Sequence, residues 1–404
     1  MDRDEIGFPF PDCGGAGPAA EFSRISRESF VPVRLPNGTS AALVCGHDEL
    51  RQLLTDERFS RAGAAAHGMS ARSTESLALN SADPPDHTRR RRVVTGAFTA
   101  RRAEALRPAV RRAAGDLVAG LITRRSPAEL IADFSLPLAV GVICRIMGVP
   151  FEDWPRFQPL VEVMMSTGGH PPETVRTAHA EMFAYFAELF DAGAAGGGDG
   201  GEDTVLRTIV EAVLGDVLGR DEAIHLAYGL LMAGYETTSN QLAICVYQLL
   251  SDCGRWESLR GAPAATLRQA VDELVRLTSL PATGGVPHVA VADTAIGGRE
   301  VRAGQVLVPV FAAANRDPRV FADPDEIRLD RDGPGHLAFG HGRHVCLGAP
   351  LARVELEEAL DVLLRELPGL ELAVPESELR WRSGTFIRGL TALPVRWPEY
   401  RTIR

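Results

Sequence analysis

One stretch, residues 221–251, constrains the fold of this 404-residue chain more than any other. Its apolar residues recur at helical spacing on nearly every side of the helix. At about 1.5 Å per residue, a helix of this length spans the width of a domain, and a helix without a polar face is buried. The pattern therefore predicts one long central helix around which the other elements pack.

Most of the remaining chain is also predicted to be helical, with strands near its two ends. Strand-like alternation occupies residues 289–311, 370–397 and 31–45, where Pro36-Asn37-Gly38 predicts a hairpin. We predict a loop at residues 60–83, a flexible connector at residues 192–203 and a meander at residues 315–332. Helical spacing predicts helices at residues 47–59, 102–122, 136–147, 151–165, 174–190, 204–214, 267–277 and 348–367. Since no repeat or inter-domain linker is present, we expect a single, mainly α domain with small β sheets (α+β) over residues 1–404.

The composition narrows the kind of partner and compartment. With 45% hydrophobic and 24% charged residues, the chain has the composition of a soluble globular protein. Its net charge of −10 argues against binding nucleic acid. The six cysteines are scattered without a Cys-x-x-Cys pair, which suits a reducing cytosol. Because there is no signal-peptide core and no stretch apolar enough for a membrane span, we expect a cytoplasmic protein that does not bind a membrane.

A glycine-rich turn at residues 339–348 carries the most informative cysteine. Cys346 directly precedes an amphipathic segment, so backbone N–H groups and the positive end of a helix are expected to lower the pKa of its thiol and favour the metal-binding thiolate. The glycines let the backbone approach something large and flat. Two other readings are a plain buried cysteine and a zinc site of His341, His344 and Cys346, which lacks an obvious fourth ligand.

The predicted central helix contains an acid and two threonines, in the sequence AGYETT at positions 233–238. Polar groups in the middle of a buried apolar helix need partners. The Thr237 hydroxyl can donate to the carbonyl of Ala233 and loosen the helix beside Gly234. That would open a groove where dioxygen can sit. The alternative is a polar contact between two helices.

Two further pairs are set by helical spacing. His87 and Arg91 follow a proline turn and lie four residues apart, so they share one helix face and can clamp a carboxylate. Glu273 and Arg276 lie three apart, and such a pair taken alone is an ordinary surface contact.

The cysteine turn fills all six fixed positions of the pattern F-G-x-G-x-H-x-C-x-G. With the other motifs in the same order, the chain resembles the bacterial cytochrome P450 family from about residue 31 to residue 397. The resemblance implies the P450 fold, with one haem b between the long central helix and the helix after the cysteine turn. It implies Cys346 as the fifth iron ligand, and Glu236 and Thr237 as the pair that delivers protons. The haem contacts that it implies are His87, Arg91, Ala233, Gly234, His288, Phe339, Gly340, His344 and Gly348.

Two positions depart from the family pattern. His288 stands where an arginine usually contacts a haem propionate, and we predict a weaker contact from the shorter imidazole. The pair at positions 273 and 276 matches a buried Glu-x-x-Arg that locks the meander. Glu326 stands where a third arginine is common, so Arg328 or Arg331 is expected to replace it.

By the same resemblance, the chain is a monomeric monooxygenase that uses O2 and electrons passed from NAD(P)H by a separate ferredoxin reductase and ferredoxin. It would hydroxylate or epoxidise a medium-to-large natural-product intermediate of antibiotic or other secondary metabolism, free or bound to a carrier protein. Oxidative coupling and β-hydroxylation of a carrier-bound amino acid stay open, whereas a haem-based sensor would not need Glu236 and Thr237. Pocket walls are expected around Met232 and at residues 60–83, 161–172, 281–286 and 384–387. A basic surface for ferredoxin is expected at Arg89, Arg90, Arg92, Arg101, Arg102, Arg343 and Arg353.

Overall fold

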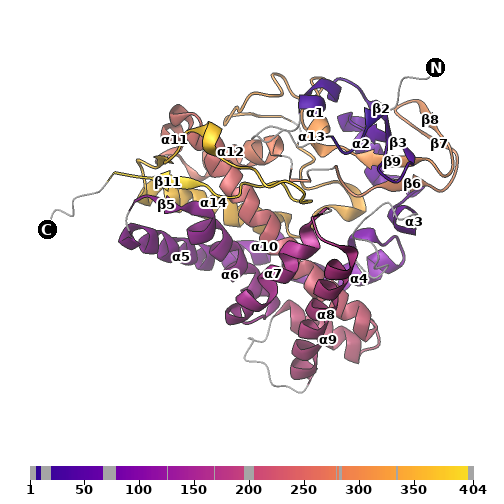
Figure 1. Cartoon of the computed structure of the whole chain (residues 1–404), viewed down its shortest axis with the longest axis horizontal. Coiled ribbons are helices and arrows are strands. Elements are labelled where there is room, and N and C mark those ends of the chain that lie inside the picture. Colours follow the sequence, from indigo (N-terminus) through magenta and orange to yellow (C-terminus); the bar gives the residue numbers. More distant parts are fainter. Residues whose placement is uncertain are drawn as a thin grey trace.

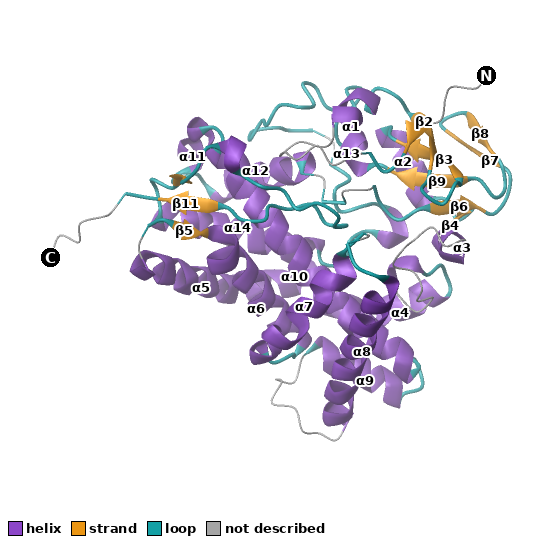
Figure 2. Cartoon of the chain, viewed as in Figure 1, coloured by secondary structure: helices purple, strands orange, loops and turns teal. Residues whose placement is uncertain are grey.

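The computed structural model describes residues 6–10, 20–66, 79–124, 126–167, 169–194, 204–278, 280–281, 284–333 and 335–398. Helices form the body of the molecule, and the strands gather in two places on opposite sides of it (Figures 1 and 2). One group of strands lies near the N-terminus and the other near the C-terminus, as the sequence predicts.

The predicted central helix is α10 (Arg220–Leu250), within one residue of its expected bounds. From Tyr235 to Leu249 every side chain except that of Thr237 is buried. The helix runs through the middle of the helical body (Figure 1). It packs mainly against α6 (Leu136–Met147) and α8 (Pro172–Ala194), and it also contacts α14 (Ala349–Glu366).

The larger sheet has six strands in the order β1-β2-β3-β9-β6-β4 and contains the predicted hairpin. Strands β2 (Phe30–Arg34) and β3 (Ser40–Val44) pair antiparallel. Gly38 lies in their turn with a φ of +81°, which glycine adopts without strain. Strand β3 continues in parallel to β9 (Val306–Pro309), and β1 (Ile6–Gly7) lies parallel to β2.

The other edge of this sheet positions two side chains of the site. Strand β6 (His288–Ala290) lies antiparallel to β4 (Phe59–Ser60), and the two strands pair residue for residue. The residue that follows β4 is Arg61, and the one that begins β6 is His288. The antiparallel register therefore brings these two side chains together.

Two smaller strand groups complete the sheets. In the three-stranded sheet, β11 (Pro394–Arg396) lies between β10 (Glu371–Leu372) and β5 (Ala128–Glu129). Strands β7 (Thr294–Ile296) and β8 (Arg299–Val301) form a separate hairpin. The prediction of strands throughout residues 370–397 is wrong in its middle, because the chain between β10 and β11 makes only isolated bridges.

The other predicted helices are confirmed, some with shifted ends: α2 (His47–Thr55), α5 (Ala100–Arg124), α7 (Trp154–Met165), α9 (Val205–Leu214) and α12 (Ala264–Leu277). Helix α4 (Asp86–Thr95) begins directly after Pro85, as expected. Periodicity did not predict the short helices α1 (Ala20–Ile25), α11 (Cys253–Leu259) and α13 (Phe311–Ala314).

The prediction of a loop over residues 60–83 is wrong at its start, where α3 (Arg61–Ala66) follows β4. The Ser60 hydroxyl accepts the backbone N–H of Gly63 at 2.7 Å and caps this helix. Its side chains are mostly small, so no apolar periodicity marks it. Residues 67–78, and residues 195–203 of the predicted connector, lie outside the described residues.

The predicted Glu-x-x-Arg pair is buried on α12 and holds the meander. Glu273 accepts hydrogen bonds from Arg276 Nε at 2.7 Å, from Arg331 Nε at 2.9 Å and from the backbone N–H of Arg328 at 2.9 Å. Burial alone would raise the pKa of Glu273, but these bonds lower it. Of the two arginines expected to replace the missing one, Arg331 supplies its side chain and Arg328 only its backbone.

Candidate functional site

The cysteine turn is a compact loop closed by its own backbone. The Cys346 N–H donates to the Phe339 carbonyl at 2.7 Å. Gly340 and Gly342 have φ values of +74° and +68°, in the region that favours glycine. A Cβ on Gly342 would lie 2.4 Å from the Leu54 carbonyl oxygen, so only glycine fits where the loop meets α2.

The Cys346 side chain is exposed, yet enough protein surrounds its sulfur that burial raises the pKa of the thiol. The backbone N–H groups of Gly348 and Ala349 and the charges of Arg91 and Arg353 act in the opposite direction. The prediction of a lowered thiol pKa is therefore wrong for the free cysteine, because desolvation outweighs the local donors. The exposure leaves the sulfur accessible to a bound iron.

Predicted contacts from α4 and the cysteine turn come together. The rings of His87 and His344 lie 4.1 Å apart, and Arg91 Nη2 donates to the Val345 carbonyl at 2.8 Å. Both ring nitrogens of His87 and Nε2 of His344 are buried without a hydrogen-bond partner. Burial, followed by nearby arginine charges, lowers the pKa of His87 to about 4 and lowers that of His344 further.

Unpartnered buried nitrogens are costly and call for an acceptor. Two carboxylates of a haem would supply several acceptors here, and Cys346 on the adjoining loop offers sulfur to the iron. The residues present therefore fit the cofactor that the family resemblance implies.

His288 joins this cluster from β6. Its Nε2 accepts a hydrogen bond from Arg61 Nε at 3.2 Å, and its Nδ1 is buried near the backbone of Val286. Burial and the charge of Arg61 lower the pKa of His288. Sequence reasoning missed Arg61, whose position depends on the pairing of β4 with β6.

The middle of α10 has the local geometry that the sequence predicts. Thr237 Oγ1 donates to the Ala233 carbonyl at 2.7 Å. Ala233 is exposed, and Gly234 and Thr237 are half-buried, whereas the helix is buried from Thr238 to Leu249. A Cβ on Gly234 would lie 2.5 Å from Ile143, so this glycine also lets α10 approach α6.

Glu236 is buried on the same helix, and its Oε1 pairs with Arg382 Nη1 at 2.6 Å. Arg382 lies in the segment between β10 and β11, so the contact is not the one between two helices considered as an alternative. No local pattern marks Arg382, and sequence reasoning missed it.

Three of the predicted pocket walls meet through their backbones. The Phe386 N–H donates to the Met165 carbonyl at 3.0 Å, and the Thr167 N–H donates to the Gly384 carbonyl at 2.7 Å. Pro281 forms an isolated bridge with Ile387. Residues 282–283 lie outside the described residues.

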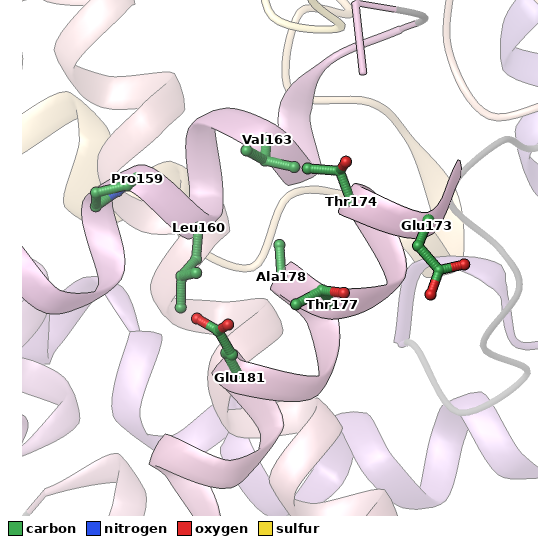
Figure 3. A pocket seen from close by; sticks show the side chains of 8 residues that line it. All are labelled: Pro159, Leu160, Val163, Glu173, Thr174, Thr177, Ala178 and Glu181. Atoms are coloured by element: carbon green, nitrogen blue, oxygen red, sulfur yellow. The ribbon is translucent and has the colours of Figure 1, made fainter. Parts of the chain in front are cut away.

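A separate open groove lies between α7 and α8 (Figure 3). Leu160, Val163 and Ala178 give it an apolar lining, and Glu173 and Glu181 line it from α8. It contains none of the predicted catalytic or haem-binding residues.

The predicted basic surface is smaller than expected. Arg89 and Arg90 both pair with Glu222 in the first turn of α10, at 2.6 and 2.5 Å. Arg353 pairs with Asp272 at 2.8 Å. Arg92 and Arg101 keep exposed side chains.

Neither a zinc site nor a membrane-spanning helix is found in the described residues. In the described part of the chain, no three His, Cys, Asp or Glu side chains are grouped to hold a metal ion, so the alternative zinc site is not assembled. No helix within the described ranges is long and apolar enough to cross a membrane.

Known proteins match nearly the whole chain. Residues 265–375 match the family model for cytochrome P450. The chain is 40% identical to mycinamicin IV hydroxylase/epoxidase of Micromonospora griseorubida, over 96% of this chain and 98% of that protein. It is 41% identical to nocardicin C N-oxygenase of Nocardia uniformis subsp. tsuyamanensis, over 90% and 92%. The crystal structure of SgvP, a putative thioether synthase involved in the tailoring of griseoviridin, matches with a TM-score of 0.91 at 34% identity, over 97% of this chain and 100% of that chain.

Proposed function

The chain belongs to the cytochrome P450 family, and from this we propose that it hydroxylates or epoxidises a medium-to-large natural-product intermediate with haem b and O2. The observation that carries the proposal is the group of unpartnered imidazole nitrogens next to the loop of Cys346. Cys346 offers one sulfur ligand for the iron, and the buried imidazoles offer donors for two carboxylates. Together they supply what a haem needs from a protein.

Haem bound here supplies the oxygen-activating redox chemistry. Cys346 would hold its iron, while the Gly348 and Ala349 N–H groups stabilise the negative sulfur. His87, Arg91, His288 and His344 would bind its propionates. The haem would be lined by Phe339, Gly340 and Gly348 of the cysteine turn and by Ala233 and Gly234 of α10.

Protons would reach the active site through Glu236 and Thr237. The Thr237 hydroxyl donates to the Ala233 carbonyl, which leaves its lone pairs free to accept a proton from a neighbour. Glu236 would relay protons towards this hydroxyl, and its ion pair with Arg382 keeps the carboxylate oriented.

The substrate class rests on the relatives. Their names refer to mycinamicin IV and nocardicin C, and we extend from them only the secondary-metabolic origin of the substrate. Electrons would come from a separate ferredoxin and its reductase in the cytoplasm, and Arg92 and Arg101 are exposed for such a partner.

The spectrum of the reduced protein with carbon monoxide tests the proposal. A thiolate-ligated haem gives a Soret band shifted to long wavelength, and Cys346→Ala should abolish that band. A band typical of a histidine-ligated haem, or its persistence in Cys346→Ala, would overturn the assignment. Soret shifts across a panel of macrolides, polyketides and carrier-bound peptides would then identify the substrate class.

A further inference from the structure

Arg61 lies beside the one haem contact that departs from the family pattern. Its Nε donates to His288 Nε2 at 3.2 Å, and its Nη1 donates to the Asn80 side chain at 2.8 Å. Arg61 begins α3, where the pairing of β4 with β6 sets it against His288. Its exposed fraction is only 6%, so the charge lies in the interior.

Among the described residues, no carboxylate oxygen lies within 4.0 Å of the Arg61 guanidinium nitrogens, so no ion pair neutralises this charge. Asp83 attracts Arg61 from further away. The Asp83 oxygens instead accept hydrogen bonds from the Ser60 hydroxyl and from the backbone N–H groups of Arg61 and Ala62. Burial consequently lowers the pKa of Arg61 to about 10. A buried cation without an ion pair is costly unless an anion binds to it.

The side chains around Arg61 are also short of acceptors. The positive charge of Arg61 lowers the pKa of His87, His288 and His344, which places all three near it. Two of these rings, those of His87 and His344, have buried nitrogens without a partner. Within the described parts of the chain, Nη2 of Arg61 makes no hydrogen bond of its own. A buried group of donors with a net positive charge fits a carboxylate.

We propose that Arg61 binds a haem propionate and supplies the guanidinium that the family pattern carries at position 288. Neutral His288 accepts from Nε and holds the planar group in place, while the remaining N–H groups face the carboxylate. The inference rests on the proposed haem function. Arg61 follows β4, the strand paired with β6, so its charge lies in the same cluster as His288.

The rate at which purified holoenzyme loses haem to excess apomyoglobin tests this role. Arg61→Ala should accelerate the loss by about tenfold to a hundredfold, because a charge-assisted hydrogen bond is removed. Arg58→Ala is the matched control, since the exposed side chain of Arg58 pairs with Asp56 away from the haem-binding cluster. Adding His288→Arg to Arg61→Ala should bring the rate back to within a few-fold of wild type.

Three results would overturn the inference. One is a rate for Arg61→Ala equal to that of Arg58→Ala, and another is failure of His288→Arg to restore retention. The third is an equal acceleration of haem loss in Asn80→Ala, which would show that Arg61 acts by holding Asn80 in place. If the wild-type protein itself lacks the thiolate carbon monoxide spectrum, the proposed function fails, whereas these three results leave that spectrum intact.

Discussion

Replacing Arg331 by alanine should lower the free energy of unfolding by about 2–3 kcal/mol. Its guanidinium donates to both carboxylate oxygens of Glu273 and to three backbone carbonyls of the meander, and its side chain is only 9% exposed. A charge-assisted hydrogen bond contributes about 1.5–3 kcal/mol, and breaking a fully buried pair costs about 3–5 kcal/mol. The lower range applies because Arg276 still neutralises Glu273 in the variant.

Thermal unfolding of the holoenzyme, followed by circular dichroism, measures this loss. For 404 residues, an unfolding entropy of about 2.1 cal/mol/K per residue gives about 0.8 kcal/mol/K, so Tm should fall by about 3 °C. Arg328→Ala is the matched control, because exposed Arg328 contributes only its backbone N–H. It should leave Tm within about 1 °C. Equal Tm values for Arg331→Ala and Arg328→Ala would show that the guanidinium does not complete the buried pair.

Three further changes probe the loop, the proton path and the N-terminus of α10. Gly342→Ala should abolish haem retention, because alanine is strained at a φ of +68° and its Cβ would collide with the Leu54 carbonyl. Position 335 has open space around it, so the control Gly335→Ala should bind haem normally. Thr237→Val should keep the haem spectrum but raise the hydrogen peroxide formed per NAD(P)H consumed by about tenfold, whereas Thr237→Ser should behave like wild type. Equal peroxide yields from Thr237→Val and wild type would remove Thr237 from the proton path. Burial opposes ionisation of Glu222, but hydrogen bonds from two arginines lower its pKa to about 2. Ionised Glu222 therefore stabilises the folded state by about 3 kcal/mol above pH 4.5, and this stabilisation is lost as the pH falls from 4.5 towards 2. An acid unfolding curve of Glu222→Gln as steep as that of wild type would contradict this.

Local features of this fold could be predicted because they depend on neighbours in the sequence. The length of α10 follows from apolar spacing, and the Thr237–Ala233 bond lies within one helical turn. Contacts across the chain could not be predicted in this way. Arg61 and His288 are 227 positions apart, and Arg382 and Glu236 are 146 apart. Only the strand pairing and the path of the C-terminal segment decide that they meet.

The Cys346 thiol illustrates a different limit. Its local donors were predictable from the glycine turn and the following helix. Desolvation depends on everything packed around the sulfur, and it reverses the direction of the pKa shift.

The backbone pairing between residues 165–167 and residues 384–386 bears on how such an enzyme changes substrate during evolution. These predicted pocket walls are joined by N–H and carbonyl groups, which every residue type except proline provides. A mutation at position 166, 167 or 385 can exchange a side chain without removing these backbone groups, whereas Gly384, with a φ of +65°, is restricted to glycine. Single substitutions at these three positions can therefore change the lining of the predicted pocket while the backbone pairing between its walls is kept.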